Sequence, residues 1–95
     1  MTVNYDGSNF NDLIKERVLV DFYADWCGPC KMLGPVLESV SDSIKVLKVN
    51  VDNNQDLARE YGVMSIPCVV LFEDGKEVKR SVGFVPEAKM RDFIK

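Results

Sequence analysis

The chain has 95 residues, of which 46% are hydrophobic, and carries a formal net charge of −3 with no histidine. This length suits one compact domain, residues 1–95, and the apolar fraction is too high for a disordered chain. The acidic balance, without a stripe of Lys or Arg, argues against nucleic acid and acidic membranes as main partners. No apolar run approaches the roughly 18 residues of a membrane span, and no signal-peptide pattern opens the chain. We therefore expect a cytoplasmic protein.

The N-terminal quarter of the chain predicts a short strand, a helix and a longer strand. Residues 2–4 are a candidate strand, and residues 8–16 have the pattern of a helix with Ser8 as its candidate N-cap. The run 18–24 is apolar and rich in β-branched and aromatic side chains. Such a run is typical of a central strand buried on both faces.

Residues 27–44 predict an amphipathic helix directly after that strand. Pro35 lies inside this stretch and should kink the helix, because its ring removes a donor and crowds the preceding turn. The apolar positions recur at helical spacing, and they are Leu33, Val36, Leu37, Val40 and Ile44.

The middle of the chain predicts a second strand and a short helix. Residues 45–52 largely alternate apolar and polar side chains, which indicates the strand. Residues 53–62 favour the helix, with Asn53 or Asn54 as its N-cap and Gly62 as its stop.

The last third predicts a hairpin and a terminal helix. Residues 67–83 contain two extended runs around Asp74-Gly75, a pair that favours a tight turn. Residues 86–95 open with proline and then place apolar side chains on one helical face. Crossover helices require parallel pairing of the early strands, whereas the hairpin adds antiparallel strands. The predicted fold class is therefore α/β, a mixed four- to five-stranded sheet flanked by helices on both faces.

The number of cysteines limits the kinds of site that this chain can form. A disulfide scaffold does not suit three cysteines, because one is always left over. A structural zinc site needs four ligands, and this chain has only Cys68 beyond Cys27 and Cys30. We therefore predict no metal and no cofactor, and interpret Cys27 and Cys30 as a redox pair.

The pair stands where the buried strand ends and the helix begins. Free backbone N–H groups and the positive end of the helix dipole stabilise a thiolate there, so the pKa of Cys27 should fall. The spacing predicts an exposed Cys27 at the helix edge and a partly covered Cys30 within reach of a disulfide. Pro29 suits a first helical turn, and Gly28 leaves room for another backbone. Two buried core cysteines are the alternative, which the intervening Gly-Pro disfavours.

The motif WCGPC after VLVDFYAD resembles the active site of the thioredoxin family. The similarity extends over nearly the whole chain, through Pro35, the run SIPCVVLF at 65–72, the Asp-Gly hairpin and VGF at 82–84. It implies the thioredoxin fold and a protein-disulfide reductase that acts on disulfide-containing protein substrates. It also implies a thioredoxin reductase as electron donor. Nothing in the chain demands more than a monomer.

The resemblance implies a role for each residue of the site. The Cys27 thiolate would attack a substrate disulfide, and Cys30 would then attack Cys27 and release the reduced substrate. Asp21 would be a buried acid of raised pKa behind Cys30 that assists proton transfer, accompanied by Lys48. The residues alone also allow a simpler interpretation, in which Asp21 is a strand-edge carboxylate paired with a lysine.

The resemblance also implies an apolar docking surface beside Cys27. An X-Pro bond is trans in roughly nineteen of twenty cases, but the family pattern implies a cis Ile66-Pro67 bond. The neighbouring backbone would pair with an extended substrate strand. Core packing is the alternative role for Trp26. The candidate surface residues are Trp26, Gly28, Pro29, Ile66, Pro67, Val82 and Gly83.

Three features depart from the family pattern. Cys68 stands where Thr is common, and we expect an inert buried thiol, with a contact to the redox pair as the alternative. Tyr23 stands where many relatives have a second Trp. The N-terminus is shorter than is typical, so the first strand should be short or absent.

Other functions stay open at this point. An oxidant or isomerase of the same fold is one, although such proteins often carry a histidine between the cysteines. A glutaredoxin is another, although Pro-Tyr is usual there. A binding module that does not need its cysteines is the third.

Overall fold

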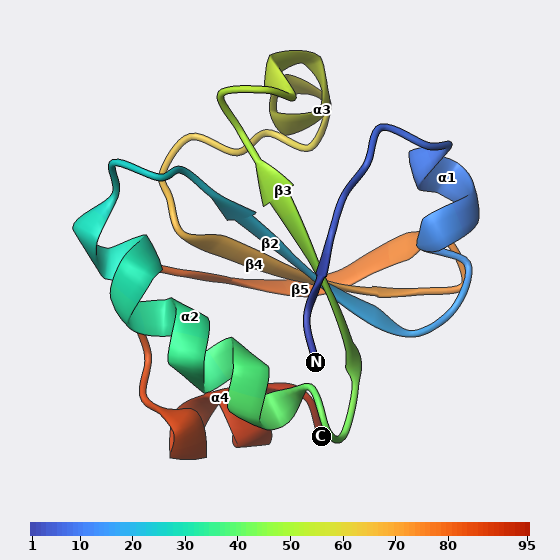
Figure 1. Ribbon diagram of the computed structural model, residues 1–95. Coiled ribbons are helices and arrows are strands. Elements are labelled where there is room, and N and C mark those ends of the chain that lie inside the picture. The colour runs from blue at the N-terminus through green and yellow to red at the C-terminus, as the bar shows by residue number, and fades with distance from the viewer.

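The computed structural model describes residues 1–95 and contains one five-stranded sheet, with strands in the order β1-β3-β2-β4-β5. Figure 1 shows this sheet running through the centre of the molecule, with helices on both sides. The predicted α/β fold class is confirmed. The elements are β1 (Val3–Asn4), α1 (Phe10–Leu13), β2 (Val18–Tyr23), α2 (Gly28–Val40), β3 (Lys45–Asn50), α3 (Gln55–Glu60), β4 (Cys68–Glu73), β5 (Lys76–Val82) and α4 (Glu87–Phe93).

The pairing follows from the connections. β2 pairs parallel with β3, and β1 pairs parallel with β3 on the other side. The helix α2 makes the crossover that parallel strands need. β4 pairs antiparallel with both β2 and β5, as the hairpin predicts. The two-residue β1 agrees with the expectation of a short first strand.

The sheet separates two hydrophobic clusters. Helices α2 and α4 cover one face and α1 and α3 cover the other (Figure 1). Side chains of β2 alternate between them, since Leu19 belongs to the α2 side and Val20 to the α3 side. The strand is therefore buried on both faces, as predicted, and only Tyr23 at its end is partly exposed.

The N-terminal helix is shorter than predicted. Residues 8–16 were expected to be helical from Ser8, but α1 spans only Phe10–Leu13 and its N-cap is Asn9. The preceding residues form a turn instead, because the Ser8 N–H donates to Asp6 Oδ1 and Gly7 adopts a φ of +90°. This turn keeps Ser8 out of the capping position.

Other helix boundaries also differ by a few residues. Helix α2 contains Pro35 and ends at Val40, before the predicted limit at residue 44. Asn54, and not Asn53, is the N-cap of α3, but its amide donates to the carbonyl of Asn50 and makes no cap bond. Local propensity therefore located the helices, and neighbouring contacts set their ends.

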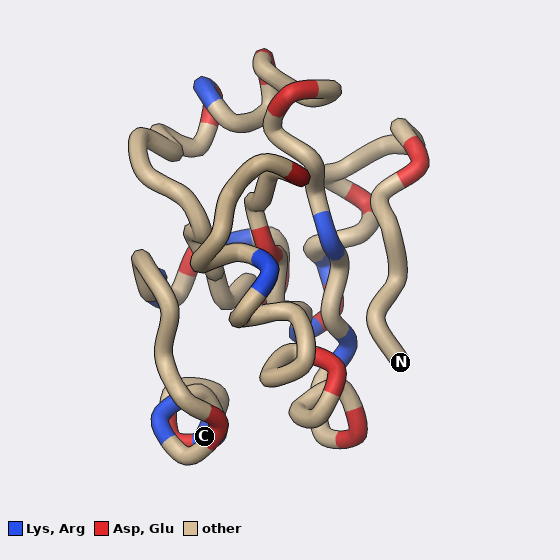
Figure 2. Tube along the Cα trace, turned by 60° about the vertical axis from the view of Figure 1, so that its left-hand side comes forward, with Lys and Arg blue, Asp and Glu red and all other residues tan.

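Charged residues are spread over the molecule. Figure 2 shows Lys and Arg interspersed with Asp and Glu along the chain, without a stripe of one sign. None of the helices has the length and apolar character to cross a membrane.

Candidate active site

The two cysteines Cys27 and Cys30 form a disulfide at the junction of β2 and α2. Their Cα atoms lie 5.2 Å apart. Cys27 is the N-cap of α2, with an extended φ of −88°, and Cys30 lies in the first turn. The spacing of three residues therefore places both sulfurs at the helix N-terminus, as predicted.

The helix terminus acts on the Cys27 sulfur directly. The backbone N–H of Cys30 donates to Cys27 Sγ over 3.2 Å. This N–H is one of the groups at a helix start that lack an intrahelical acceptor. A thiolate at Cys27 would gain from this bond and from the helix dipole, which lowers the pKa of a cysteine in such a position.

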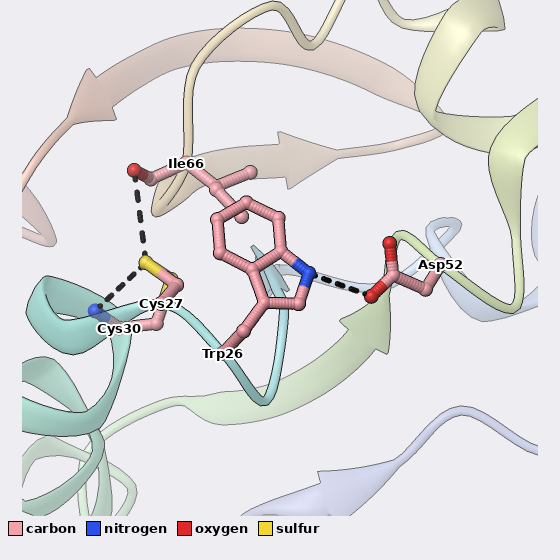
Figure 3. The surroundings of a disulfide bond; sticks show 5 residues. All are labelled: Trp26, Cys27, Cys30, Asp52 and Ile66. Carbon is pink, nitrogen blue, oxygen red and sulfur yellow. Dashed lines mark hydrogen bonds between the residues drawn. A yellow bond between two sulfur atoms is a disulfide. The ribbon is translucent and has the colours of Figure 1, made fainter.

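Cys27 is more buried than predicted. The expectation of an exposed Cys27 was wrong, because the residue is only 5% exposed, and Cys30, which was expected to be partly covered, is 4% exposed. It belongs to a small cluster with Ala24 and Cys30, against which Val51 and Ile66 pack. Its sulfur lies 3.9 Å from the carbonyl oxygen of Ile66, a contact that is marked by a dashed line in Figure 3. The residues that bury Cys27 are distant from it in the sequence, so its place at the edge of a helix does not predict this burial.

Asp21 is a buried acid on the side of the sheet that α2 covers. It is 1% exposed, and strand alternation places it on the same face as Leu19. Neither carboxyl oxygen has a hydrogen-bond partner within the protein. Burial raises the pKa of Asp21 to about 6, and the positive charge of Lys48 opposes this shift.

Lys48 lies beside Asp21 but does not pair with it tightly. The two residues are partners in the β2–β3 register. The ammonium group of Lys48 instead sits over the ring of Tyr23, 4.5 Å from the ring centroid. The simpler interpretation, a carboxylate paired with a lysine, is therefore wrong for Asp21. Tyr23, Lys48 and Cys30 line one open cleft.

The predicted docking residues gather around the disulfide. Trp26 is 69% exposed, and Gly28, Pro29 and Val82 are also exposed, while Ile66 and Gly83 are partly exposed. Core packing is therefore excluded for Trp26. The Ile66-Pro67 bond is cis, as the resemblance implied. Pro67 itself is buried directly before β4, so it does not line the predicted docking surface.

Comparisons with known proteins agree with this geometry. The family model described as thioredoxin matches residues 1–95. Thioredoxin from Bacillus subtilis strain 168 is 48% identical over 81 residues, which cover 81% of this chain and 78% of that protein. Thioredoxin from Chlamydia caviae is 56% identical over 81 residues, which cover 81% of this chain and 79% of that protein.

A solved structure shows the same likeness in three dimensions. A mutant thioredoxin from Halobacterium salinarum NRC-1 matches with a TM-score of 0.91 and 43% identity, over 98% of this chain and 87% of that chain. The chain belongs to the thioredoxin family. This is a family of protein-disulfide oxidoreductases, and its redox-active cysteine pair is present here as Cys27 and Cys30.

Asp52 is a residue of the candidate site that the sequence pattern did not single out. The indole N–H of Trp26 donates to Asp52 Oδ2 over 2.9 Å (Figure 3). The signal was available, because Asp52 follows β3 and Trp26 follows β2. The carboxyl ends of parallel neighbours meet at one edge of a sheet. Asp52 thus holds the indole in place beside the disulfide.

Cys68, the residue that departs from the thioredoxin pattern, is buried in the cluster on the α3 side of the sheet. Burial raises the pKa of its thiol, which Arg80 partly opposes. The redox pair belongs to a different cluster. The expectation of a buried Cys68 is confirmed, and burial disfavours the thiolate form of this cysteine.

Proposed function

We propose that this protein is a general protein-disulfide reductase in which Cys27 is the nucleophile and Cys30 is the resolving cysteine. The observation that carries the proposal is the position of Cys27 as the N-cap of α2, with the Cys30 N–H directed at its sulfur. This arrangement stabilises a thiolate at Cys27 in preference to Cys30.

In the first step, the Cys27 thiolate attacks one sulfur of a substrate disulfide. A bond forms between Cys27 Sγ and that sulfur, the substrate disulfide breaks, and the other substrate sulfur leaves as a thiolate that takes a proton from solvent. Trp26, Gly28, Pro29, Ile66, Val82 and Gly83 are proposed to form the docking surface, with Pro67 supporting it.

In the second step, Cys30 attacks Cys27 and the mixed disulfide breaks. The Cys30 thiol must lose its proton, and Asp21 is the proposed acceptor through water. With a pKa raised to about 6, Asp21 is ionised near neutral pH but holds a proton more readily than an exposed carboxylate. Lys48 would stabilise its ionised form.

The products are a substrate dithiol and the Cys27–Cys30 disulfide, so two electrons pass from the protein to the substrate. A thioredoxin reductase is the proposed source of the electrons that restore the dithiol. A reducing compartment, the cytoplasm, suits this direction of reaction.

Trapping the mixed disulfide tests these assignments. Reduced protein is mixed with insulin, a protein that contains disulfides, and adducts are resolved on a non-reducing gel. The parent chain should reduce insulin without a lasting adduct. Cys30→Ser should accumulate a covalent adduct, because the resolving thiol is absent, and Cys27→Ser should neither react nor form one.

Cys68→Ser is the matched control, since it removes a thiol on the far side of the sheet. It should reduce insulin at a rate within about twofold of the parent. An adduct that accumulates with Cys27→Ser, and not with Cys30→Ser, would reverse the assigned roles. A parent chain that leaves insulin oxidised would disprove the reductase function.

A further inference from the structure

The loop between α3 and β4 brings unpaired backbone to the redox pair. Residues 63–66 precede Pro67, and the Ile66 carbonyl oxygen lies 3.9 Å from Cys27 Sγ. The backbone N–H groups of residues 64–66 form no backbone hydrogen bond within the protein. Unpaired backbone N–H groups are what an extended segment of another chain needs in order to pair with this loop.

Hydrogen bonds tie the two ends of this loop to Arg80 of β5 and to Gly83 just after β5, and the N–H of Val63 also donates to the carbonyl of Ala58 in α3 over 2.9 Å. At its C-terminal end, the N–H of Gly83 donates to the carbonyl of Pro67 over 2.8 Å. At its N-terminal end, Tyr61 is the C-cap of α3 and Gly62 follows it, so their carbonyls lie where a helix leaves acceptors without an intrahelical partner. Arg80 of β5 binds both of them.

Arg80 acts as a clamp through four hydrogen bonds. Its Nη2 donates to the Tyr61 carbonyl over 2.7 Å, and its Nη1 to the Gly62 carbonyl over 3.4 Å. Its Nε and Nη2 also donate to the two carboxyl oxygens of Glu77, each over 2.7 Å. Glu77 thereby fixes the orientation of the guanidinium group, because two parallel hydrogen bonds to one carboxylate hold the guanidinium plane in place.

We propose that Arg80 is a positioning residue for substrate docking. By holding the end of α3, it keeps the unpaired backbone of residues 64–66 beside Cys27, where an extended segment of a protein substrate can pair with it. The inference rests on the proposed reductase function. It concerns binding of protein substrates and not the exchange chemistry itself, because the hydrogen-bond partners of Arg80 include neither Cys27 nor Cys30.

Arg91 is a control that distinguishes a positioning role of Arg80 from a general contribution to the stability of the protein. The Arg80 side chain is 31% exposed, and ion pairs at such sites contribute little to stability. Arg91 has a similar exposure of 37% and a similar set of partners, namely Glu87, Asp42 and the Ser39 carbonyl. It ties α4 to the end of α2 on the opposite face of the sheet, away from the loop.

The experiment compares a large and a small substrate. Pre-reduced parent, Arg80→Gln, Arg80→Lys and Arg91→Gln react in a stopped-flow instrument with insulin, or with bis(hydroxyethyl) disulfide, which is small and neutral. Trp26, the only tryptophan, reports the reaction by fluorescence. Hydrogen exchange of the residue 64–66 amides is measured on the same proteins.

The expected result is a split between the substrates. Arg80→Gln should lower the second-order rate constant with insulin by about tenfold and leave that with the small disulfide within about twofold. Arg80→Lys should recover only part of this loss, because lysine has no planar fork. Exchange of the loop amides should become faster in Arg80→Gln, and Arg91→Gln should change none of these values.

Three results would overturn the inference. One is an equal loss with both substrates, which would indicate damage to the site as a whole. Another is the same split in Arg91→Gln, which would indicate general destabilisation. The third is a parent-like insulin rate in Arg80→Gln. A parent chain that reduces neither substrate would instead remove the proposed function on which the inference rests.

Discussion

Asp21 combines a charge with almost complete burial, and this gives the protein a particular dependence on pH. Its pKa is raised from 3.8 to about 6, first by desolvation, against the opposing charge of Lys48. The folded state therefore holds this proton more tightly than the unfolded state does. Between pH 3.8 and about 6, the free energy of unfolding should fall as pH rises.

We expect Asp21→Asn to remove this loss of stability. The pKa difference corresponds to about 3 kcal/mol. The variant should therefore exceed the parent in free energy of unfolding by up to that amount at about pH 8, with the difference shrinking toward about pH 3. Urea unfolding of the oxidised proteins over this pH range measures it.

Asp25→Asn, a change of an exposed aspartate, is the control and should follow the parent at every pH. A constant difference between Asp21→Asn and the parent would show that Asp21 does not titrate differently in the two states. The same Asp21→Asn substitution should slow the second step of insulin reduction, because the proposed proton acceptor is gone.

The hairpin between β4 and β5 depends on backbone conformations that few residues adopt. Asp74 has a φ of +54° and Gly75 a φ of +81°. Gly75 also donates its N–H to the Ile14 carbonyl over 2.9 Å, which joins the turn to the segment after α1. The turn sets the adjacent pairs Glu73–Lys76 and Phe72–Glu77, and an irregularity between Leu71 and Phe72 then shifts the register before Arg80, which pairs with Val70.

Two glycine substitutions should have opposite effects. Gly75→Ala should lower the free energy of unfolding by about 1 kcal/mol, because alanine is strained at positive φ. Gly34→Ala, inside α2, should raise it by up to about 1 kcal/mol, since alanine is the better helix former. A Cβ at Gly34 meets no atom within 4 Å. Urea titrations at one pH compare both, and a loss in Gly34→Ala would contradict the helical argument.

The two hydrophobic clusters are joined by the strands between them. Leu37 belongs to the cluster under α2 and Phe72 to the cluster under α3, and both are fully buried. The central strands supply alternate side chains to each cluster, so neither face can unfold while the other stays intact. We infer that the two faces unfold together.

Truncation on either face should therefore destabilise the same single transition. Leu37→Ala should cost about 2 to 5 kcal/mol and Phe72→Ala about 3 to 5 kcal/mol. Far-UV circular dichroism and Trp26 fluorescence should report coincident unfolding curves in both variants. Separate midpoints for the two probes would show that the faces unfold independently.

The sequence predicts those helices and strands of this fold that depend on patterns within a few neighbouring residues. The apolar run at β2, the helical spacing in α2 and the Asp-Gly turn each act over a few residues. An apolar periodicity reflects the face of a helix or strand that is buried, and the folded protein has these elements where the pattern predicts them. The helix predicted at residues 8–16 was too long for a local reason as well. The Ser8 N–H bonds to Asp6, and Gly7 has a positive φ, so the chain turns before α1 begins.

The pairing of Cys27 with Cys30 was likewise determined by the sequence itself. Two cysteines three residues apart at a strand-to-helix junction can only meet at the helix N-terminus, and the tertiary structure adds nothing to that. The tertiary structure alone decided the surroundings of the pair. The carbonyl that covers Cys27 comes from 39 residues away, and the Asp52 partner of Trp26 from 26 residues away. Arg80 reaches the end of α3 across 19 residues. These contacts depend on which strands become neighbours, and that choice is made by the burial of the whole sheet between its helices.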